Sequence, residues 1–283
     1  MQQHPPLNNE HRTAMNIAIA YNRDIYALKV LNLLLPTLAS HQVLLLHSAR
    51  VGAAKADEPA ALTQLHQLEQ QVLADVAALS DAVLPTTFEQ LSQRYSEGDL
   101  QFHHVNEPSG LRTLAEFSPD LMLSVRFGKI LKSEAIAIPT HGVINLHSGL
   151  LPAYRGVMPT FRAMLAGDTH IGTTLHWISD ASIDTGSAIG TTRLPVDPNQ
   201  SYLNHVWRLY DSGVEQLLNA VAAIEGGELG KPSESPPSER TPGSYYSFPD
   251  HGAVKRFEER GLHLFRPQDV ADICGQFNRG RLG

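Results

Sequence analysis

An asparagine and a histidine lie two positions apart at the end of an apolar run in the middle of the chain. They are Asn145 and His147, in the segment INLHSGLLPAYRG. Side chains two positions apart in a strand share one face, so an amide that can stabilise an oxyanion and an imidazole that can move a proton are expected side by side. Asp184, in ASIDTG, follows in a turn that can direct its carboxylate to the same sheet end. Pairing with Asp184 would favour the imidazolium form of His147.

Each of these residues also has a purely structural interpretation. The chain has 14 histidines, and a single histidine is more often structural than catalytic. An aspartate in a glycine-containing turn commonly caps that turn, and an asparagine at a strand end commonly caps the next helix. The joint pattern of the three residue types is what indicates an active site.

The elements that must position these residues alternate between strands and helices. Apolar runs predict strands at NIAIAY, QVLLLHS, residues 102–105, LMLSV, GVINL and GTTLHWI, and helical spacing predicts helices over residues 25–35, 58–83 and 203–226, from 109 onward and after 129. Such alternation predicts an α/β fold with a Rossmann-like, mostly parallel sheet, helices on both faces and a small C-terminal extension. Ligands bind such sheets outside the carboxyl ends of the strands.

Composition changes suggest three parts of unequal size. Residues 1–14 are polar and predict a disordered tail, residues 15–227 a catalytic domain, and residues 228–283 a linker with a small C-terminal segment. The linker is the Pro/Ser-rich run KPSESPPSERTPGS. For the segment that follows, with Tyr245, Tyr246 and Phe248, packing as a clip is favoured over folding beside the cleft or contacting a second copy.

Composition also limits the classes of function. The net charge of −7 argues against a general binder of nucleic-acid phosphates. The single cysteine, Cys274, rules out disulfides within the chain and a four-cysteine zinc site, and no metal is expected. Neither a signal peptide nor a membrane-spanning apolar run is visible, so a cytoplasmic location with no membrane partner is expected. A homo-oligomer is left open.

Three ordered motifs carry a family resemblance. NLHSGLLPAYRG, MPTFRAMLAGDTHIGTTLHWI and IDTG, within residues 124–189, resemble the folate-dependent formyltransferase family, whose members act on glycinamide ribonucleotide, methionyl-tRNA or nucleotide sugars. The resemblance implies 10-formyltetrahydrofolate as cosubstrate and Asn145, His147 and Asp184 as catalytic residues. It also implies a folate pocket whose wall includes Arg126, Phe127, Gly128, Lys129, Ile130, Leu131 and Asp180.

Two departures from the family pattern are visible. Gly149 stands where many relatives carry the serine of SLLP, and NRDIY replaces the Gly-rich phosphate loop of the ribonucleotide-using members. Arg126 and Lys129 are interpreted either as solvated charges on a helix cap or as contacts to the glutamate tail of folate.

The predicted reaction is formyl transfer from 10-formyltetrahydrofolate to the amine of a small-molecule acceptor. An amino-acid-like amine such as N-hydroxyornithine is favoured slightly over an amino-sugar nucleotide, because NRDIY offers no phosphate cradle. No nucleic-acid partner is expected, since residues 228–283 are short for a five-stranded nucleic-acid-binding barrel. The alternatives are a 10-formyltetrahydrofolate hydrolase and a folate-binding module without turnover.

Overall fold

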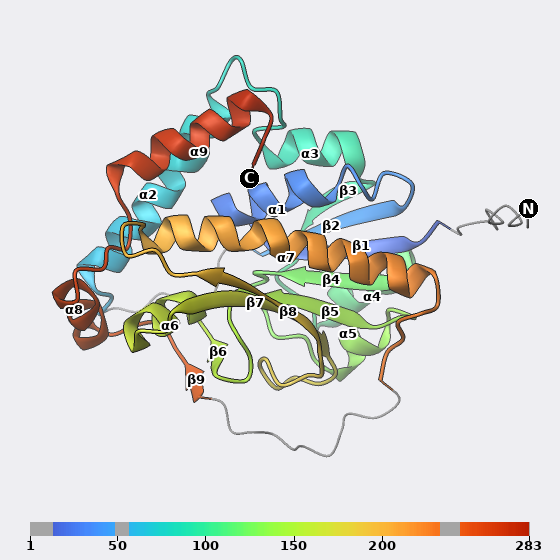
Figure 1. Ribbon diagram of the computed structural model, residues 1–283. Coiled ribbons are helices and arrows are strands. Elements are labelled where there is room, and N and C mark those ends of the chain that lie inside the picture. The colour runs from blue at the N-terminus through green and yellow to red at the C-terminus, as the bar shows by residue number, and fades with distance from the viewer. Residues whose placement is uncertain (1–13, 49–56, 233–243, 283) are drawn as a thin grey trace, which may run out of the picture.

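The computed structural model describes residues 14–48, 57–232 and 244–282 (Figure 1). Residues 1–13, which make up nearly all of the predicted tail, and residues 233–243 of the predicted linker lie outside that part. Among the described helices, none is long and apolar enough to cross a membrane.

The centre of the molecule is a seven-stranded sheet. The first five strands run parallel, whereas β7 is antiparallel to β5 and β8 is antiparallel to β7. The mostly parallel sheet predicted from the sequence is therefore confirmed. In sheet order its strands are β3 (Gly98–Gln101), β2 (Gln42–Ser48), β1 (Asn16–Asn22), β4 (Leu121–Val125), β5 (Val143–His147), β7 (His170–Ile178) and β8 (Ala188–Pro195).

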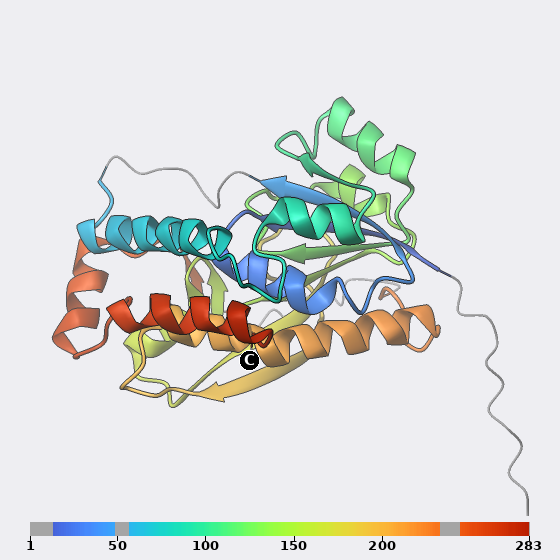
Figure 2. The ribbon, with the colours of Figure 1, turned by 90° about the horizontal axis from the view of Figure 1, so that it is seen from above.

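Helices cover both faces of the sheet, as Figures 1 and 2 show. Alternation along β1 explains why, because Ile17 and Ile19 join one apolar core while Ala18 and Ala20 join another. The first core is closed by α1 (Ile25–Leu34), α2 (Ala60–Ala77), α3 (Phe88–Tyr95), α6 (Pro159–Ala166) and α7 (Tyr202–Glu225), and the second by α4 (Pro108–Phe117) and α5 (Ser133–Ala137).

One predicted strand lies elsewhere. The expected strand at residues 102–105 is a turn, and the strand of this region, β3, comes just before it. β3 pairs with β2 as far as Gln101 opposite His47, one residue before β2 ends. The Phe102 amide still donates to His47 O at 2.7 Å, after which the chain turns so that Phe102 and Val105 enter the second core.

The C-terminal segment packs onto the main domain. The three-residue strand β9 (Ser244–Tyr246) pairs in parallel with β6 (Tyr154–Gly156), and α8 (His251–Glu259) and α9 (Pro267–Arg279) follow. In α9, Phe277 is fully buried, and Gln276 accepts a 3.0 Å hydrogen bond from Trp207 Nε1 of α7. These contacts make α8 and α9 part of the first core, whereas Tyr245 and Phe248 line the cavity described below. The start of the segment therefore folds beside the cleft, which the sequence ranked below a packing clip.

Candidate active site

A cavity of about 700 Å³ opens at the carboxyl ends of β1, β4 and β5. Its lining includes Asn22, Ser124, Asn145 and His147, which lie within the last three residues of these neighbouring strands. This is the edge at which open α/β sheets bind ligands, because the loops that leave adjacent strands diverge there. The alternation of strands and helices in the sequence predicted the same edge.

The three predicted catalytic residues meet in this cavity. Asn145 and His147 share one face of β5, and His147 Nδ1 lies 3.6 Å from Asp184 Oδ1. Asp184 adopts a left-handed conformation, with φ at 54°, in the loop between β7 and β8. Its second carboxylate oxygen accepts a 2.8 Å hydrogen bond from the Gly156 amide. The turn thus directs the carboxylate to the sheet end, as the sequence predicted.

A fourth residue, His176, belongs to the same group. It lies on β7 directly opposite Asn145, and its Nε2 is 3.0 Å from Asn145 Nδ2 and 3.6 Å from Asp184 Oδ1. The sequence analysis predicted a strand here without a role for His176, because an alternating pattern reveals neither the partner strand nor its register. Asn145, His147, His176 and Asp184 are called the histidine cluster below.

Backbone carbonyls fix where the protons of the two imidazoles lie. A carbonyl oxygen can only accept, so His147 Nε2 donates to Tyr154 O at 2.8 Å and His176 Nδ1 donates to Trp177 O at 2.9 Å. When the rings are neutral, the other nitrogens, His147 Nδ1 and His176 Nε2, carry lone pairs. Both of these nitrogens face Asp184. The cluster is therefore ready to accept a proton.

Burial and pairing act in opposite directions within the cluster. Burial lowers the pKa of His147 below its ordinary value, and the opposing effect of Asp184 is smaller. The pairing expected from the sequence is therefore present, but it does not favour the imidazolium on balance. Burial raises the pKa of Asp184, yet His147, His176 and the Gly156 amide outweigh this and lower it to about 2. Among the described residues, no three His, Cys, Asp or Glu side chains are grouped to hold a metal ion.

The segment predicted to hold folate forms one wall of the cavity. Residues 126–131 and Asp180 all line it. Asn106 holds this wall at two points, since its Nδ2 donates to Ile130 O and its Oδ1 accepts from Lys132 N, each at 2.8 Å. Ser48 Oγ accepts from the Gly128 amide at 3.0 Å. The wall is therefore a fixed surface.

Arg126 differs from the first of its two predicted interpretations, the solvated charge, while its contact with the glutamate tail of folate stays a prediction. It follows β4 in a left-handed conformation, with φ at 56°, and its Nε donates to Asp24 Oδ2 at 2.7 Å. Its side chain is 21% exposed, so it is a largely buried ion pair and not a solvated charge on a helix cap. The Asp24 partner comes from the loop after β1, far away in the sequence.

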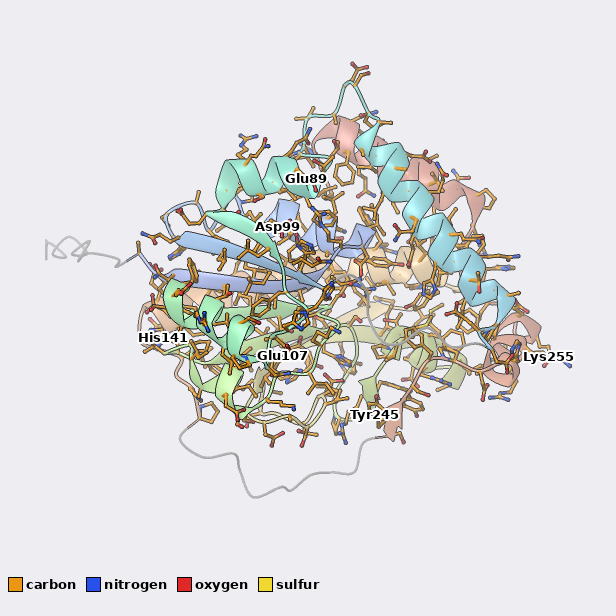
Figure 3. The ribbon with its side chains drawn as sticks, turned by 180° about the vertical axis from the view of Figure 1, so that it is seen from behind. Glu89, Asp99, Glu107, His141, Tyr245 and Lys255 are labelled. Carbon is orange, nitrogen blue, oxygen red and sulfur yellow. The ribbon has the colours of Figure 1, made fainter. Side chains whose placement is uncertain are left out.

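In the loop after β1, the carboxylate of Asp24 lies at the N-terminus of helix α1. Asp24 caps α1 by accepting from the Ala27 amide at 2.9 Å. Arg23 pairs with Glu89 and with Asp99, its NH2 group lying 3.2 Å from Asp99 Oδ2. Figure 3 labels these two carboxylates. A carboxylate thus occupies the position where a Gly-rich loop would offer amides to a phosphate. The carboxylate belongs to NRDIY, the segment that stands in place of the Gly-rich phosphate loop of the ribonucleotide-using members.

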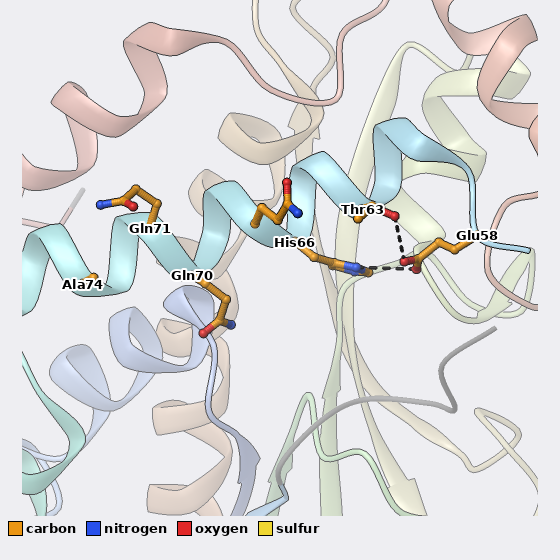
Figure 4. Close-up of a pocket in the computed structure, with 7 residues that line it drawn as sticks. Glu58, Thr63, His66, Gln70, Gln71 and Ala74 are labelled. Carbon is orange, nitrogen blue, oxygen red and sulfur yellow. Dashed lines mark hydrogen bonds and ion pairs between the residues drawn. The ribbon is translucent and has the colours of Figure 1, made fainter. Parts of the chain in front are cut away.

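The rim of the cavity is aromatic and extends along α2. Tyr245 and Phe248 of the C-terminal segment line it, and Tyr245 lies at the edge of the molecule in Figure 3. A shallower groove follows α2 from Glu58, where His66 Nδ1 lies 3.5 Å from Glu58 Oε1 (Figure 4). Since Glu58, His66 and Gln70 line both, the groove continues the cavity.

The comparisons with known proteins agree with this fold. The family model described as Formyl transferase matches residues 49–221, so the chain belongs to this family. Over 150 residues the chain is 33% identical to the methionyl-tRNA formyltransferase of Chlamydia pneumoniae, a match that covers 53% of this chain and 46% of that protein. The chain thus spans about half the length of the curated relatives that it matches.

Solved structures show the same fold at low sequence identity. A glycinamide ribonucleotide transformylase from Symbiobacterium toebii matches with a TM-score of 0.54 and 14% identity, covering 78% of this chain and 92% of that chain. An N-formyltransferase from Helicobacter canadensis, in complex with folinic acid and dTDP-3-aminofucose, matches with a TM-score of 0.53 and 16% identity, covering 83% of this chain and 71% of that chain.

Proposed function

We propose that the protein transfers the formyl group of 10-formyltetrahydrofolate to the amine of a small molecule. The observation that carries this proposal is the convergence of Asn145, His147 and Asp184, joined by His176, in one cavity at the carboxyl ends of the strands. These groups suit a reaction in which an oxyanion forms and a proton leaves an attacking amine.

Formyl-folate as donor is supported by family membership and by one structural neighbour. The Helicobacter canadensis protein was solved with folinic acid, a formylated folate. In this chain, the fixed wall at residues 126–131 is the proposed folate contact, together with Asp180. Phe127 and Ile130 supply apolar surface for a flat ring, which suits the mixed lining of small-molecule sites.

The proposed chemistry uses the hydrogen-bonding pattern of the cluster. The acceptor nitrogen attacks the formyl carbon, and the formyl oxygen takes up negative charge that the Asn145 amide stabilises. The proton released by the acceptor nitrogen goes to His147 Nδ1, which faces Asp184 Oδ1 at 3.6 Å. The bond between the formyl carbon and N10 of the folate then breaks, and that proton is delivered to N10. The products are a formamide and tetrahydrofolate.

The buried carboxylate makes this proton transfer feasible. With its pKa lowered to about 2, Asp184 stays ionised and lies beside the imidazolium that forms during the reaction. Neutral His147 is the resting form because burial lowers its pKa, so it can accept the proton. His147 thus acts as a base, and Asp184 stabilises the charge that His147 acquires.

The proposed acceptor is a small molecule, with charged initiator tRNA as the alternative to test. A net charge of −7 disfavours contacts to many phosphates, whereas several curated relatives are named as methionyl-tRNA formyltransferases. The decisive experiment incubates the full chain with 10-formyltetrahydrofolate and a panel of amines, and detects tetrahydrofolate and formylated product by mass.

Each rival function gives a distinct result in this assay. Formylated small amine supports the proposal, and charged initiator tRNA formylated better than every small amine contradicts it. Tetrahydrofolate and formate produced without any amine would identify a hydrolase. Folate binding without turnover would identify a binding module. Failure to bind any reduced folate would refute the proposal.

A further inference from the structure

Five polar side chains that take no part in the proton transfer proposed above meet in the same cavity. One of them, Arg126, begins the proposed folate wall, and its guanidinium is turned to Asp24. Asp24 begins α1, Glu69 lies on α2, Arg126 follows β4, and Tyr202 and Tyr210 lie on α7 (Figure 1). All five line the cavity, and every one except Arg126 is less than 9% exposed. They are called the second polar cluster below.

Arg126 is held rigidly and retains unused donors. Asp24 accepts hydrogen bonds from Arg126 Nε at 2.7 Å, from Asn22 Nδ2 at 3.1 Å and from the Ala27 amide. The guanidinium carbon lies 4.5 Å from the centre of the Tyr26 ring, which supports its flat face. Neither terminal nitrogen of Arg126 has a hydrogen-bond partner within the described ranges of the chain. These two nitrogens can bind a planar anion such as a carboxylate.

Two tyrosine hydroxyl groups near Arg126 also lack partners. The Tyr210 hydroxyl is fully buried and has no hydrogen bond to any described residue, although it lines the cavity. Tyr202 lines the same cavity, and its hydroxyl makes no hydrogen bond to a described residue. A buried hydroxyl left unpaired costs free energy, so a ligand oxygen that accepts from it would be favoured. Burial acts to lower the pKa of Arg126, but Asp24, Tyr210 and Tyr202 raise it, which agrees with their closeness.

A carboxylate lies on the other side of the same cluster. Glu69 is 8% exposed, and its Oε1 accepts a 2.8 Å hydrogen bond from the Tyr26 hydroxyl. Its Oε2 has no hydrogen-bond partner among the described residues. Because Asp24 and Arg126 neutralise one another, an ionised Glu69 leaves the cluster with one negative charge. That charge suits a ligand ammonium and repels a phosphate.

We propose that the second polar cluster binds the zwitterionic head group of an α-amino acid, with the carboxylate on Arg126, Tyr202 and Tyr210 and the ammonium on Glu69. This inference rests on the proposed formyl transfer and specifies its acceptor as an amino acid with an amine on its side chain. An amino-sugar nucleotide would instead place a diphosphate against Asp24 and Glu69 or leave the tyrosines unpaired.

The distance between the two clusters fits such a ligand. In the parallel pair β4 and β5, Ser124 lies opposite Asn145 and Val125 opposite Leu146. Arg126 therefore follows β4 next to His147, and neighbouring strands are about 4.8 Å apart. A side chain of three methylene groups spans about 5 Å from Cα to its terminal nitrogen. Such an amino acid is about as long as one strand spacing, so the proposal places its side-chain amine in the histidine cluster while its head group stays on Arg126.

The test compares matched pairs of amines on the full-length protein. L-Ornithine, N5-hydroxy-L-ornithine and L-lysine are compared with the decarboxylated amines putrescine and cadaverine and with dTDP-3-aminofucose. Binding is measured by calorimetry in the presence of folinic acid, and transfer is measured with 10-formyltetrahydrofolate. We expect at least one amino acid to exceed its decarboxylated counterpart about tenfold in kcat/KM, which corresponds to the loss of one good hydrogen bond.

Two variants and one control separate recognition from folding. Glu69→Gln and Tyr210→Phe are expected to raise KM for the amino acid about tenfold and to leave the affinity for folinic acid unchanged. Tyr21→Phe is the matched control, because the Tyr21 hydroxyl is also buried and unpartnered among the described residues but lies outside the cavity lining. It should leave KM unchanged.

Either of two results would overturn the inference while the proposed function stands. These are a preference for dTDP-3-aminofucose or a diamine, and an unchanged amino-acid KM in both variants, each with folinic acid still bound. Loss of KM selectivity in the Tyr21→Phe control would also count against it. Absence of folate binding in the unaltered protein would instead refute the proposed function itself.

Discussion

Two buried carboxylates in one cavity have pKa values shifted in opposite directions. Burial acts to raise the pKa of both, but Asp184 has two imidazoles and the Gly156 amide around it, and its pKa falls to about 2. Burial raises the pKa of Glu69 most, Arg126 and the Tyr26 hydroxyl lower it, and the nearby charge of Asp24 raises it, so that it lies at about 7. The comparison shows that the number of donors around a carboxylate, and not burial alone, sets its charge.

The two clusters also differ in how many of their groups are left free. In the histidine cluster, both carboxylate oxygens of Asp184 and both nitrogens of His176 face a protein partner. In the second polar cluster, hydroxyl groups and a guanidinium edge have none among the described residues. The first arrangement is suited to moving protons, and the second is suited to a ligand.

The largest expected effect comes from removing the charge of Asp184. Asp184→Asn keeps the shape of a side chain that is only 10% exposed, but it no longer stabilises the imidazolium that forms on His147. We expect kcat to fall by about 10³-fold to 10⁴-fold, while KM for the folate changes little. Steady-state kinetics on the folded variant, with circular dichroism as a control, checks this. A variant that keeps wild-type kcat would contradict the proposed mechanism.

His147 and Asp184 are both largely buried, so alanine is a poor probe of either residue. His147 is 7% exposed and touches Tyr154 O, so truncating it would leave a cavity as well as remove a base. The conservative change is therefore the cleaner experiment at this site.

The second effect concerns the oxyanion. Asn145→Ala removes the proposed donor, and the loss of one such donor typically costs about 100-fold to 1000-fold in kcat. Asn145 lies on β5 opposite His176, so the variant should still fold with the same strand pairing. Single-turnover rates with saturating folate measure the loss. A decrease confined to KM would assign Asn145 to binding instead of chemistry.

A cluster can be predicted from the sequence only where its residues lie close together along the chain. Asn145 and His147 are two residues apart, and strand alternation alone places them on one face. Asp184 follows in a recognisable turn. The second polar cluster joins α1, α2, β4 and α7, and no local pattern indicates that Glu69 meets Arg126. His176 was missed for the same reason, because pairing between strands of distant sequence sets its partner.

The third effect tests the close approach at Gly149. A Cβ added there would lie 2.5 Å from Pro159 Cβ and 2.9 Å from His147 Nε2, the nitrogen that donates to Tyr154 O. Gly149→Ala should shift His147, and such a misplacement can cost on the order of 100-fold in kcat. Gly98→Ala is the control, since its new Cβ would meet only Leu44 Cδ1, at 3.8 Å. Equal activity in the two variants would show that the loop at Gly149 moves to accept the new Cβ without shifting His147.

The fourth effect is on the acid side of the pH profile. Because burial lowers the pKa of His147, the ring should stay neutral and basic to a pH below the ordinary value near 6.5. We expect kcat to be constant above that value and to fall about tenfold per pH unit once His147 is protonated. The profile of kcat against pH at saturating substrates measures this. A decline that begins above pH 7 would contradict a neutral, buried base.

The smallest expected effect is a change of stability with pH at Glu69. The pKa of Glu69 is raised to about 7 in the folded state, above its unfolded value near 4.3, so the folded protein holds a proton that the unfolded chain releases. Stability should therefore fall as the pH rises from about 4.5 through 7, the reverse of what Asp184 contributes. Glu69→Gln keeps the size and polarity of the side chain and cannot ionise.

Thermal unfolding of wild type and Glu69→Gln at pH 6 and pH 8 isolates this contribution, because the other titrating groups are common to both proteins. We expect wild type to lose a few degrees more in Tm between the two pH values than the variant does. Equal losses of Tm in both proteins would mean that Glu69 is already ionised at pH 6. The pKa values of Glu69 and Asp184 would then differ less than stated above. An acceptor ammonium should also cancel the difference, since ionised Glu69 becomes paired when it binds.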